Sequence, residues 1–107
     1  MNELMTKELE EVLPKLYATE DIKVNNKILQ IKYISVKSNW EWYLVEYDKE
    51  TKIAFGYTNG HYENEWGYFS LKEFEEINDE CLSIIRDKTF QKIEFIELDN
   101  DYYKVKI

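Results

Sequence analysis

The sequence predicts an α+β fold in which an antiparallel β-sheet meander is packed by two short helices. The pattern runs from a helix through several strands to a second helix and further strands, and no βαβ repeat is visible. Short turn segments separate the strands, as an antiparallel meander requires. The 107 residues suffice for one core. We therefore expect a single α+β domain over residues 1–107.

A short amphipathic helix is expected near the start of the chain. Thr6 suits the N-cap position. Apolar residues follow at the spacing of one helical face, at Leu9, Val12, Leu13 and Leu16. Pro14 lacks a backbone N–H, so the helix should end near Leu13.

Alternating side chains predict four strands in the middle of the chain. They cover residues 27–36, 40–47, 53–57 and 62–69, and turn residues lie before the first and between each pair. In the first strand, Leu29, Ile31 and Tyr33 should share one face. In the second, the alternation puts Trp40, Trp42, Leu44 and Glu46 on one side and the two tyrosines, Tyr43 and Tyr47, on the other.

The second helix carries the clearest local signals. Ser70 and Glu73 have the spacing of a reciprocal capping box, and Phe69 and Phe74 that of a hydrophobic staple. Leu71, Phe74 and Ile77 should then face the sheet. The helix should end near residues 78–79, and three shorter strands are expected at 82–85, 92–98 and 102–107.

The negative charge is concentrated in the middle of the chain. The net charge is −8 and the pI is near 4.7. Residues 41–80 hold eleven acids and three bases, which accounts for the whole net charge. This asymmetry is typical of one acidic face, which is either solvated surface or a patch that meets a basic partner. We expect no direct nucleic-acid binding, no membrane contact and a cytoplasmic location.

Signatures of catalysis are few. Three glycines cannot build a P-loop or a dinucleotide-binding loop. His61, Glu63 and Glu65 would share one strand face, where they either hold a metal or simply face solvent. Cys81 is expected to be a buried structural thiol. We expect no metal and no cofactor, and binding is favoured over catalysis.

Residues 38–48 hold the densest aromatic group. Two tryptophans and two tyrosines alternate along one strand, which is more than two short helices can cover. Core packing explains some of these rings, and partly exposed rings beside carboxylates would suit a protein interface or a ligand cleft. The candidate binding residues are Glu20, Asp21, Asn39, Trp40, Trp42, Tyr43, Glu46, Tyr47, Glu63, Glu65, Glu73 and Glu76.

Four ordered blocks resemble a known family. Residues 16–21 (LYATED), 38–48 (SNWxWYxxEYD), 67–71 (GYFSL) and 86–90 (RDxxF) are similar to blocks of a bacterial and phage family catalogued as domain of unknown function 2958. Phe55, Gly56, Gly60, Glu63 and Glu65 follow in the family's order. The resemblance covers about residues 4–90, and the tail from Gln91 departs from it. It implies a protein of phages, plasmids and other mobile elements, without an established activity or catalytic residues.

Two functions of different class stay open. The first is a non-enzymatic acidic binding protein of a mobile element, such as an inhibitor of a host defence or nucleic-acid-processing protein, whose acidic, aromatic-rich face binds a basic protein surface. The alternative is a small-ligand-binding protein or small hydrolase with a cleft near residues 19–21 and 39–42. A flat acidic surface in that region would favour the first, and a concave pocket the second.

Overall fold

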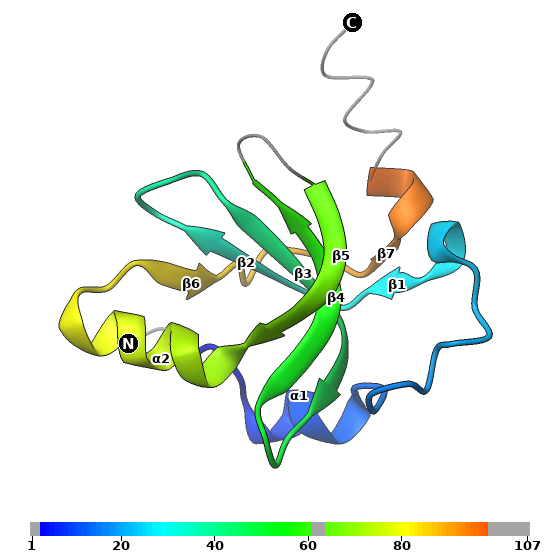
Figure 1. Ribbon diagram of the computed structural model, residues 1–107, viewed down its shortest axis with the longest axis horizontal. Coiled ribbons are helices and arrows are strands. Elements are labelled where there is room, and N and C mark those ends of the chain that lie inside the picture. Colours follow the sequence, from blue (N-terminus) through cyan, green and yellow to red (C-terminus); the bar gives the residue numbers. More distant parts are fainter. Residues whose placement is uncertain (1–2, 61–63, 99–107) are drawn as a thin grey trace, which may run out of the picture.

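A five-stranded antiparallel sheet forms the centre of the α+β fold in the computed structural model, which describes residues 3–60 and 64–98 (Figure 1). Its strand order is β5-β4-β3-β2-β6, and β1 and β7 form a separate two-stranded ladder. The elements are α1 (Lys7–Val12), the 3₁₀ turn η1 (Val24–Asn26), β1 (Ile28–Leu29), β2 (Ile31–Ser35), β3 (Glu41–Asp48), β4 (Ile53–Asn59), β5 (Asn64–Ser70), α2 (Leu71–Glu80), β6 (Ile84–Arg86) and β7 (Ile93–Glu94).

The predicted meander is confirmed, because β2, β3, β4 and β5 pair in chain order. The strand expected over residues 27–36 is interrupted at Gln30, where β1 ends and β2 begins. Leu29, Ile31 and Tyr33 are all buried. The prediction that the three share one face is wrong, because the interruption at Gln30 places Leu29 in the cluster of Tyr43 and Val45, whereas Ile31 and Tyr33 lie in the cluster of Leu44. After α2 the chain returns as β6, which pairs antiparallel with β2.

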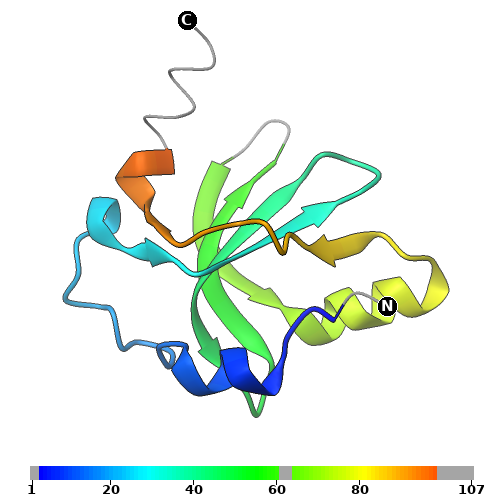
Figure 2. The ribbon, with the colours of Figure 1, turned by 180° about the vertical axis from the view of Figure 1, so that it is seen from behind.

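Each face of the sheet carries an apolar cluster. The larger cluster holds Tyr33, Leu44 and Tyr47 from the sheet, packed under α2 and the segment before α1. The smaller holds Leu29, Tyr43 and Val45, packed against the chain after β6. Figure 2 shows the segment before α1 running towards α2, whereas β1 and β7 lie together at the opposite end of the molecule.

The strand expected over residues 92–98 is wrong for most of its length. Only Ile93–Glu94 pairs with β1, and residues 95–98 are helical. The helical turn places Phe95 against Tyr57 and Trp66, with ring centroids 4.8 and 5.0 Å apart, so it covers the smaller cluster. The strand expected over residues 102–107 lies outside the described residues.

A β-bulge in β3 reverses the expected alternation. Leu44 pairs with Gly56 and Glu46 with Phe55, so Val45 is an extra residue. Tyr47 therefore joins the face of Leu44, and the prediction that Glu46 shares that face is wrong. A Cβ atom on Gly56 would lie 1.8 Å from the Tyr43 carbonyl oxygen, so the bulge requires glycine at this position.

The first helix begins and ends as predicted. The Thr6 hydroxyl accepts a hydrogen bond from Leu9 N–H at 3.2 Å, and the helix stops at Val12, before Pro14. Leu13 is buried, but Val12 is 65% exposed, contrary to its expected place on the apolar face. A helix of six residues is too short to bury that whole face.

The start of α2 also follows the prediction. Ser70 Oγ accepts from Glu73 N–H at 3.1 Å, and the Phe69 and Phe74 rings stack at 5.7 Å. Among the described residues the reverse bond, from Ser70 N–H to the Glu73 carboxylate, is absent. Ile77 is 47% exposed instead of facing the sheet.

Asn78 ends the helix by bonding to the chain that follows it. Its side-chain oxygen accepts from Ser83 N–H and Ile84 N–H, and its amide group donates to the Ile84 carbonyl. These bonds also fix the start of β6.

No helix in the described part of the chain has the length and apolar character needed to cross a membrane.

Candidate functional site

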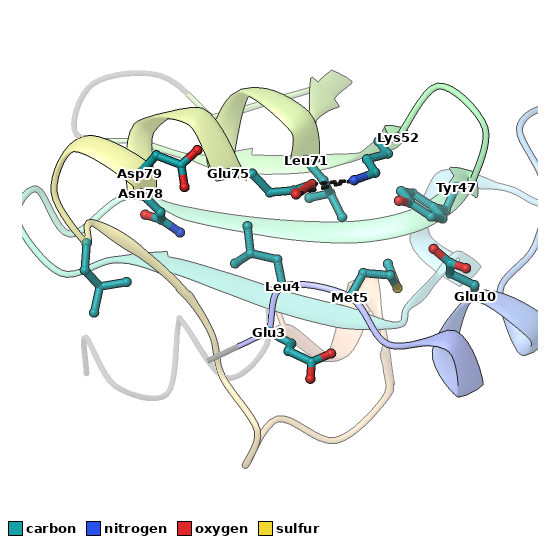
Figure 3. A pocket seen from close by; sticks show the side chains of 11 residues that line it. Glu3, Leu4, Met5, Glu10, Tyr47, Lys52, Leu71, Glu75, Asn78 and Asp79 are labelled. Carbon is teal, nitrogen blue, oxygen red and sulfur yellow. Dashed lines mark hydrogen bonds and ion pairs between the residues drawn. The ribbon is translucent and has the colours of Figure 1, made fainter. Parts of the chain in front are cut away.

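A cavity of about 700 Å³ lies between the N-terminal segment and α2 (Figure 3). Its volume is in the range of small-molecule sites, roughly 300–1,000 Å³. The apolar part of its lining is Leu4, Met5, Tyr47, Leu71 and Leu82, and the polar part is Glu3, Glu10, Lys52, Glu75, Asn78 and Asp79. We call this the α2 cavity.

Two long-range hydrogen bonds hold the outer wall of the α2 cavity in place. The Tyr33 hydroxyl donates to the Leu4 carbonyl at 2.6 Å, and Arg86 Nε donates to the Glu3 carbonyl at 2.9 Å. Burial raises the pKa of Tyr33, so its hydroxyl keeps the proton that it donates. The wall is thus fixed to β2 and β6, and Leu4 and Met5 point from it into the cavity (Figure 3).

The lining carries a strong excess of negative charge. Four of its described side chains are carboxylates, and Lys52 is the base among them. Lys52 Nζ lies 2.8 and 3.3 Å from the two Glu75 carboxylate oxygens. The hydrogen bond and the negative charge of Glu75 raise the pKa of Lys52. Glu75 therefore neutralises the charge of Lys52 within the lining. Glu3, Glu10 and Asp79 have no such partner among the described residues.

Tyr47 is affected by this negative charge. Burial first, and then the charges of Glu10, Glu75 and Asp48, raise the pKa of Tyr47 from 10 to about 12. Two of those three carboxylates line the α2 cavity. The carboxylates of the lining thus act on a side chain inside the cavity.

The carboxylates of α2 lie on two sides of the helix. Glu75 and Asp79, four residues apart, share the side that lines the cavity. Glu73, Glu76 and Glu80 lie on the rest of the helix and are exposed. Among the described residues, none of these three forms an ion pair. We call this group the outer acidic surface of α2.

The candidate residues chosen from the sequence fall into three groups. Exposed ones are Glu20, Asp21, Asn39, Trp40, Glu65, Glu73 and Glu76, while Trp42 is half-buried. Tyr43, Glu46 and Tyr47 are buried, and of these three Tyr47 lines the α2 cavity. Glu63 lies outside the described residues, as does His61.

The two parts of the cleft expected near residues 19–21 and 39–42 lie at opposite ends of β3. Trp40 packs on Trp42 at 6.0 Å, and Trp42 packs on Phe74 of α2 at 4.8 Å. Thr19 instead contacts Glu46. Glu46 lies six residues after Trp40 along the chain. At about 3.4 Å per strand residue, the two contacts are roughly 20 Å apart. The structure does not bring these segments together into one cleft.

Glu46 anchors the loop that carries Glu20 and Asp21. Its carboxylate oxygens accept from Tyr17 N–H at 2.7 Å and from Thr19 N–H at 2.9 Å, and the Thr19 hydroxyl also donates to it. Tyr17 adopts a left-handed φ of 72°, which aims its N–H at the carboxylate. Two of the sequence blocks noted above, at residues 16–21 and 38–48, are thus joined by structural hydrogen bonds.

A buried lysine completes this anchor. Lys27 is buried, and its Nζ donates to the Thr19 carbonyl at 2.6 Å and to the Thr19 hydroxyl at 3.0 Å. Nothing in the local sequence distinguishes Lys27 from an exposed lysine. The same holds for Glu3 and Glu10, which reach the α2 cavity only because the N-terminal segment packs beside α2.

The remaining chemical candidates are weak. The described residues hold no group of three His, Cys, Asp or Glu side chains placed to bind a metal. Cys81 is exposed, so the expectation of a buried thiol is wrong. Its sulfur lies 2.9 Å from Lys37 Nζ, at the end of α2, where too little chain covers it.

Comparisons of the chain with protein-family models, with curated proteins and with solved structures find no match. The resemblance to domain of unknown function 2958 therefore stays a prediction.

Proposed function

We propose that this protein is a non-enzymatic binding protein whose outer acidic surface of α2 engages a basic surface on another protein. The observation that carries the proposal is the set of exposed carboxylates of Glu73, Glu76 and Glu80, which have no base partner among the described residues. Complementary potential accelerates the encounter of two proteins and selects the partner.

Aromatic side chains beside α2 support an interface at this place. Packed rings lead from buried Phe74 through Trp42 to Trp40, which is 37% exposed. Trp40 in turn lies over Gly60, where a Cβ atom would come within 3.0 Å of its ring. A tryptophan held rigidly beside charged residues is typical of an interface hot spot.

The biological setting of the proposal rests on the resemblance to a family of mobile elements. We propose a cytoplasmic protein of a phage or plasmid that inhibits a host defence or nucleic-acid-processing protein. Proteins that bind nucleic acid present basic grooves, and carboxylates can occupy the positions that phosphates take there. The acidic surface would repel DNA itself.

A matched pair of charge-reversal variants tests the proposal. The test variant is Glu73→Lys, Glu76→Lys and Glu80→Lys. The control is Glu8→Lys, Glu11→Lys and Glu97→Lys, which changes the net charge equally at exposed sites elsewhere. Proteins captured from bacterial lysate at low and high salt are identified and purified. Association and dissociation rates are then measured for each variant.

We expect the test variant to associate at least about tenfold more slowly in low salt, with little change in dissociation. The control should associate at a rate much closer to that of the parent. Equal slowing by both variants would mean that only net charge matters. No slowing by either would mean that these carboxylates only solvate the helix, and both results would overturn the proposal.

A further inference from the structure

We infer that the α2 cavity receives the side chain of one arginine or lysine of the basic partner. The inference rests on the proposed function, since it assigns a specific pocket within that interaction. It is argued from the shape of the cavity, from the position of its charges and from its place next to the outer acidic surface of α2.

The apolar part of the lining suits the aliphatic stem of a basic side chain. Leu4 and Leu71 are almost fully buried beneath the cavity, and Met5 packs against the same core cluster. Lysine and arginine bury their methylene groups against apolar surface while the charged group stays in a polar environment. A purely acidic surface patch would lack this apolar floor.

The charges place the cationic group at one end of the cavity. Figure 3 shows Asp79 and Glu10 at opposite ends, with Lys52 on the same side of Glu75 as Tyr47 and Glu10. Lys52 is held by Glu75, so it would repel a second cation at the Tyr47 end. The end at Asp79 has no base among the described lining residues. The cation should therefore lie near Asp79, and an anionic ligand is disfavoured throughout.

The cavity is continuous with the proposed interface. Asp79 and Glu75 belong to the helix that carries Glu76 and Glu80, so one partner surface can cover both sides of α2. Leu82, which follows the helix, lines the cavity and is 57% exposed. A side chain that enters from the partner would cover this exposed leucine.

The cavity can be tested alone with a pair of small probes. N-acetyl-arginine methylamide is the cationic probe, and N-acetyl-citrulline methylamide is its neutral match in shape. Methyl NMR spectra of the full chain follow Met5, Leu4, Leu71 and Leu82 as each probe is added. The arginine probe should shift these signals in a saturable manner, and the citrulline probe should bind about tenfold more weakly, because it lacks the charge-assisted contact.

Three variants locate the site. Leu82→Trp should fill the entrance, and Asp79→Asn should remove the main charge. Asp79→Asn is expected to weaken binding of the arginine probe about tenfold, on the scale of a lost charge-assisted hydrogen bond. Leu82→Trp is expected to weaken it by a similar factor, because the indole takes the space of the probe. Glu8→Gln, at an exposed carboxylate outside the cavity lining, should leave its affinity unchanged. Both main substitutions are at exposed positions, and unchanged methyl signals of Leu29 and Val45 in the smaller cluster confirm that each variant is folded.

With the identified partner, the pocket and the surface affect different rates. Leu82→Trp should speed dissociation about tenfold with little effect on association, because packing contacts act mainly after the encounter. Charge reversal on the outer surface should act on association. If Leu82→Trp leaves dissociation unchanged, or if the arginine probe shifts no cavity methyl, the inference is overturned while the proposed function still stands on its own charge-reversal test.

Discussion

The carboxylate of Glu46 is bound by both the backbone N–H and the hydroxyl of Thr19, a residue 27 positions earlier in the chain. Glu46 is only 3% exposed, so this contact lies inside the protein. It ties the loop at residues 16–21 to β3 immediately after the bulge. Glu46 thus stabilises the fold and is not part of the charged surface, although it lies in the most acidic part of the sequence.

We expect Glu46→Ala to lower the free energy of unfolding by about 2–4 kcal/mol, because each buried donor left without an acceptor costs about 1–3 kcal/mol. Glu46→Gln keeps one acceptor oxygen and should cost less. Urea denaturation measures both. Glu76→Ala, at an exposed position, is the control and should stay within about 0.5 kcal/mol of the parent. If Glu46→Ala matches this control, the anchor contributes nothing to stability.

Asn39 has a left-handed φ of 62° in the turn between β2 and β3. This conformation costs a residue with a Cβ atom roughly 1–2 kcal/mol, and asparagine and glycine tolerate it best. We expect Asn39→Ala to lose about 1 kcal/mol of stability and Asn39→Gly to lose almost none. Both variants are measured by urea denaturation. Equal losses would show that the asparagine side chain itself, and not the backbone conformation, matters at this turn.

The N-cap of α2 should contribute measurably by itself. Ser70→Ala removes the acceptor for Glu73 N–H and should cost about 1 kcal/mol. Thermal and urea melts of this variant report the loss. Ser70→Asp restores a capping oxygen and should recover most of the lost stability. If it does not, the loss comes from the role of Ser70 as the last residue of β5 and not from the cap.

Phe74 is the aromatic residue through which α2 packs on the sheet. Its ring lies 6.0 Å from that of Tyr33 and 4.8 Å from that of Trp42. Phe74→Ala should therefore cost about 3–5 kcal/mol in a urea melt. Ile77→Ala, one turn further along the helix and 47% exposed, should cost under about 1 kcal/mol. Similar losses at the two positions would contradict the orientation of the helix.

The raised pKa of Tyr47 predicts a loss of stability in alkali. The unfolded tyrosine loses its proton near pH 10, whereas the folded one keeps it up to about pH 12. The folded state therefore binds more protons in this interval, and the free energy of unfolding falls as the pH rises through it. Burial also raises the pKa of Tyr33 and Tyr43, so the whole protein should follow this trend.

Tyr47→Phe isolates the contribution of Tyr47 to this trend. Urea midpoints of the parent and of Tyr47→Phe are compared at rising pH from 8 to about 11.5. The stability of the variant should fall less steeply above pH 10, since it has one raised tyrosine fewer. Parallel curves would show that Tyr47 titrates alike in the folded and unfolded protein.

Local sequence determined much of the architecture. The cap at Ser70 and the stacking of Phe69 on Phe74 involve residues at most five apart, so short-range geometry suffices to start α2. The shared face of Ile31 and Tyr33 likewise follows from the pleat of a strand. The acidic character of α2 also follows from its residue composition, because exposed carboxylates are solvated by water and need no partner elsewhere in the protein.

Only the tertiary structure decided which acidic and aromatic residues are available for binding. Val45 becomes an extra residue because β4 places Gly56 opposite the bulge, and this moves Glu46 into a buried network with Thr19 and Lys27. The α2 cavity likewise depends on the N-terminal segment, which Tyr33 and Arg86 hold beside the helix. Periodicity records which side of an element is apolar, but not which distant segment covers it. That choice depends on packing and hydrogen bonding between residues far apart in the chain, and no local pattern encodes it.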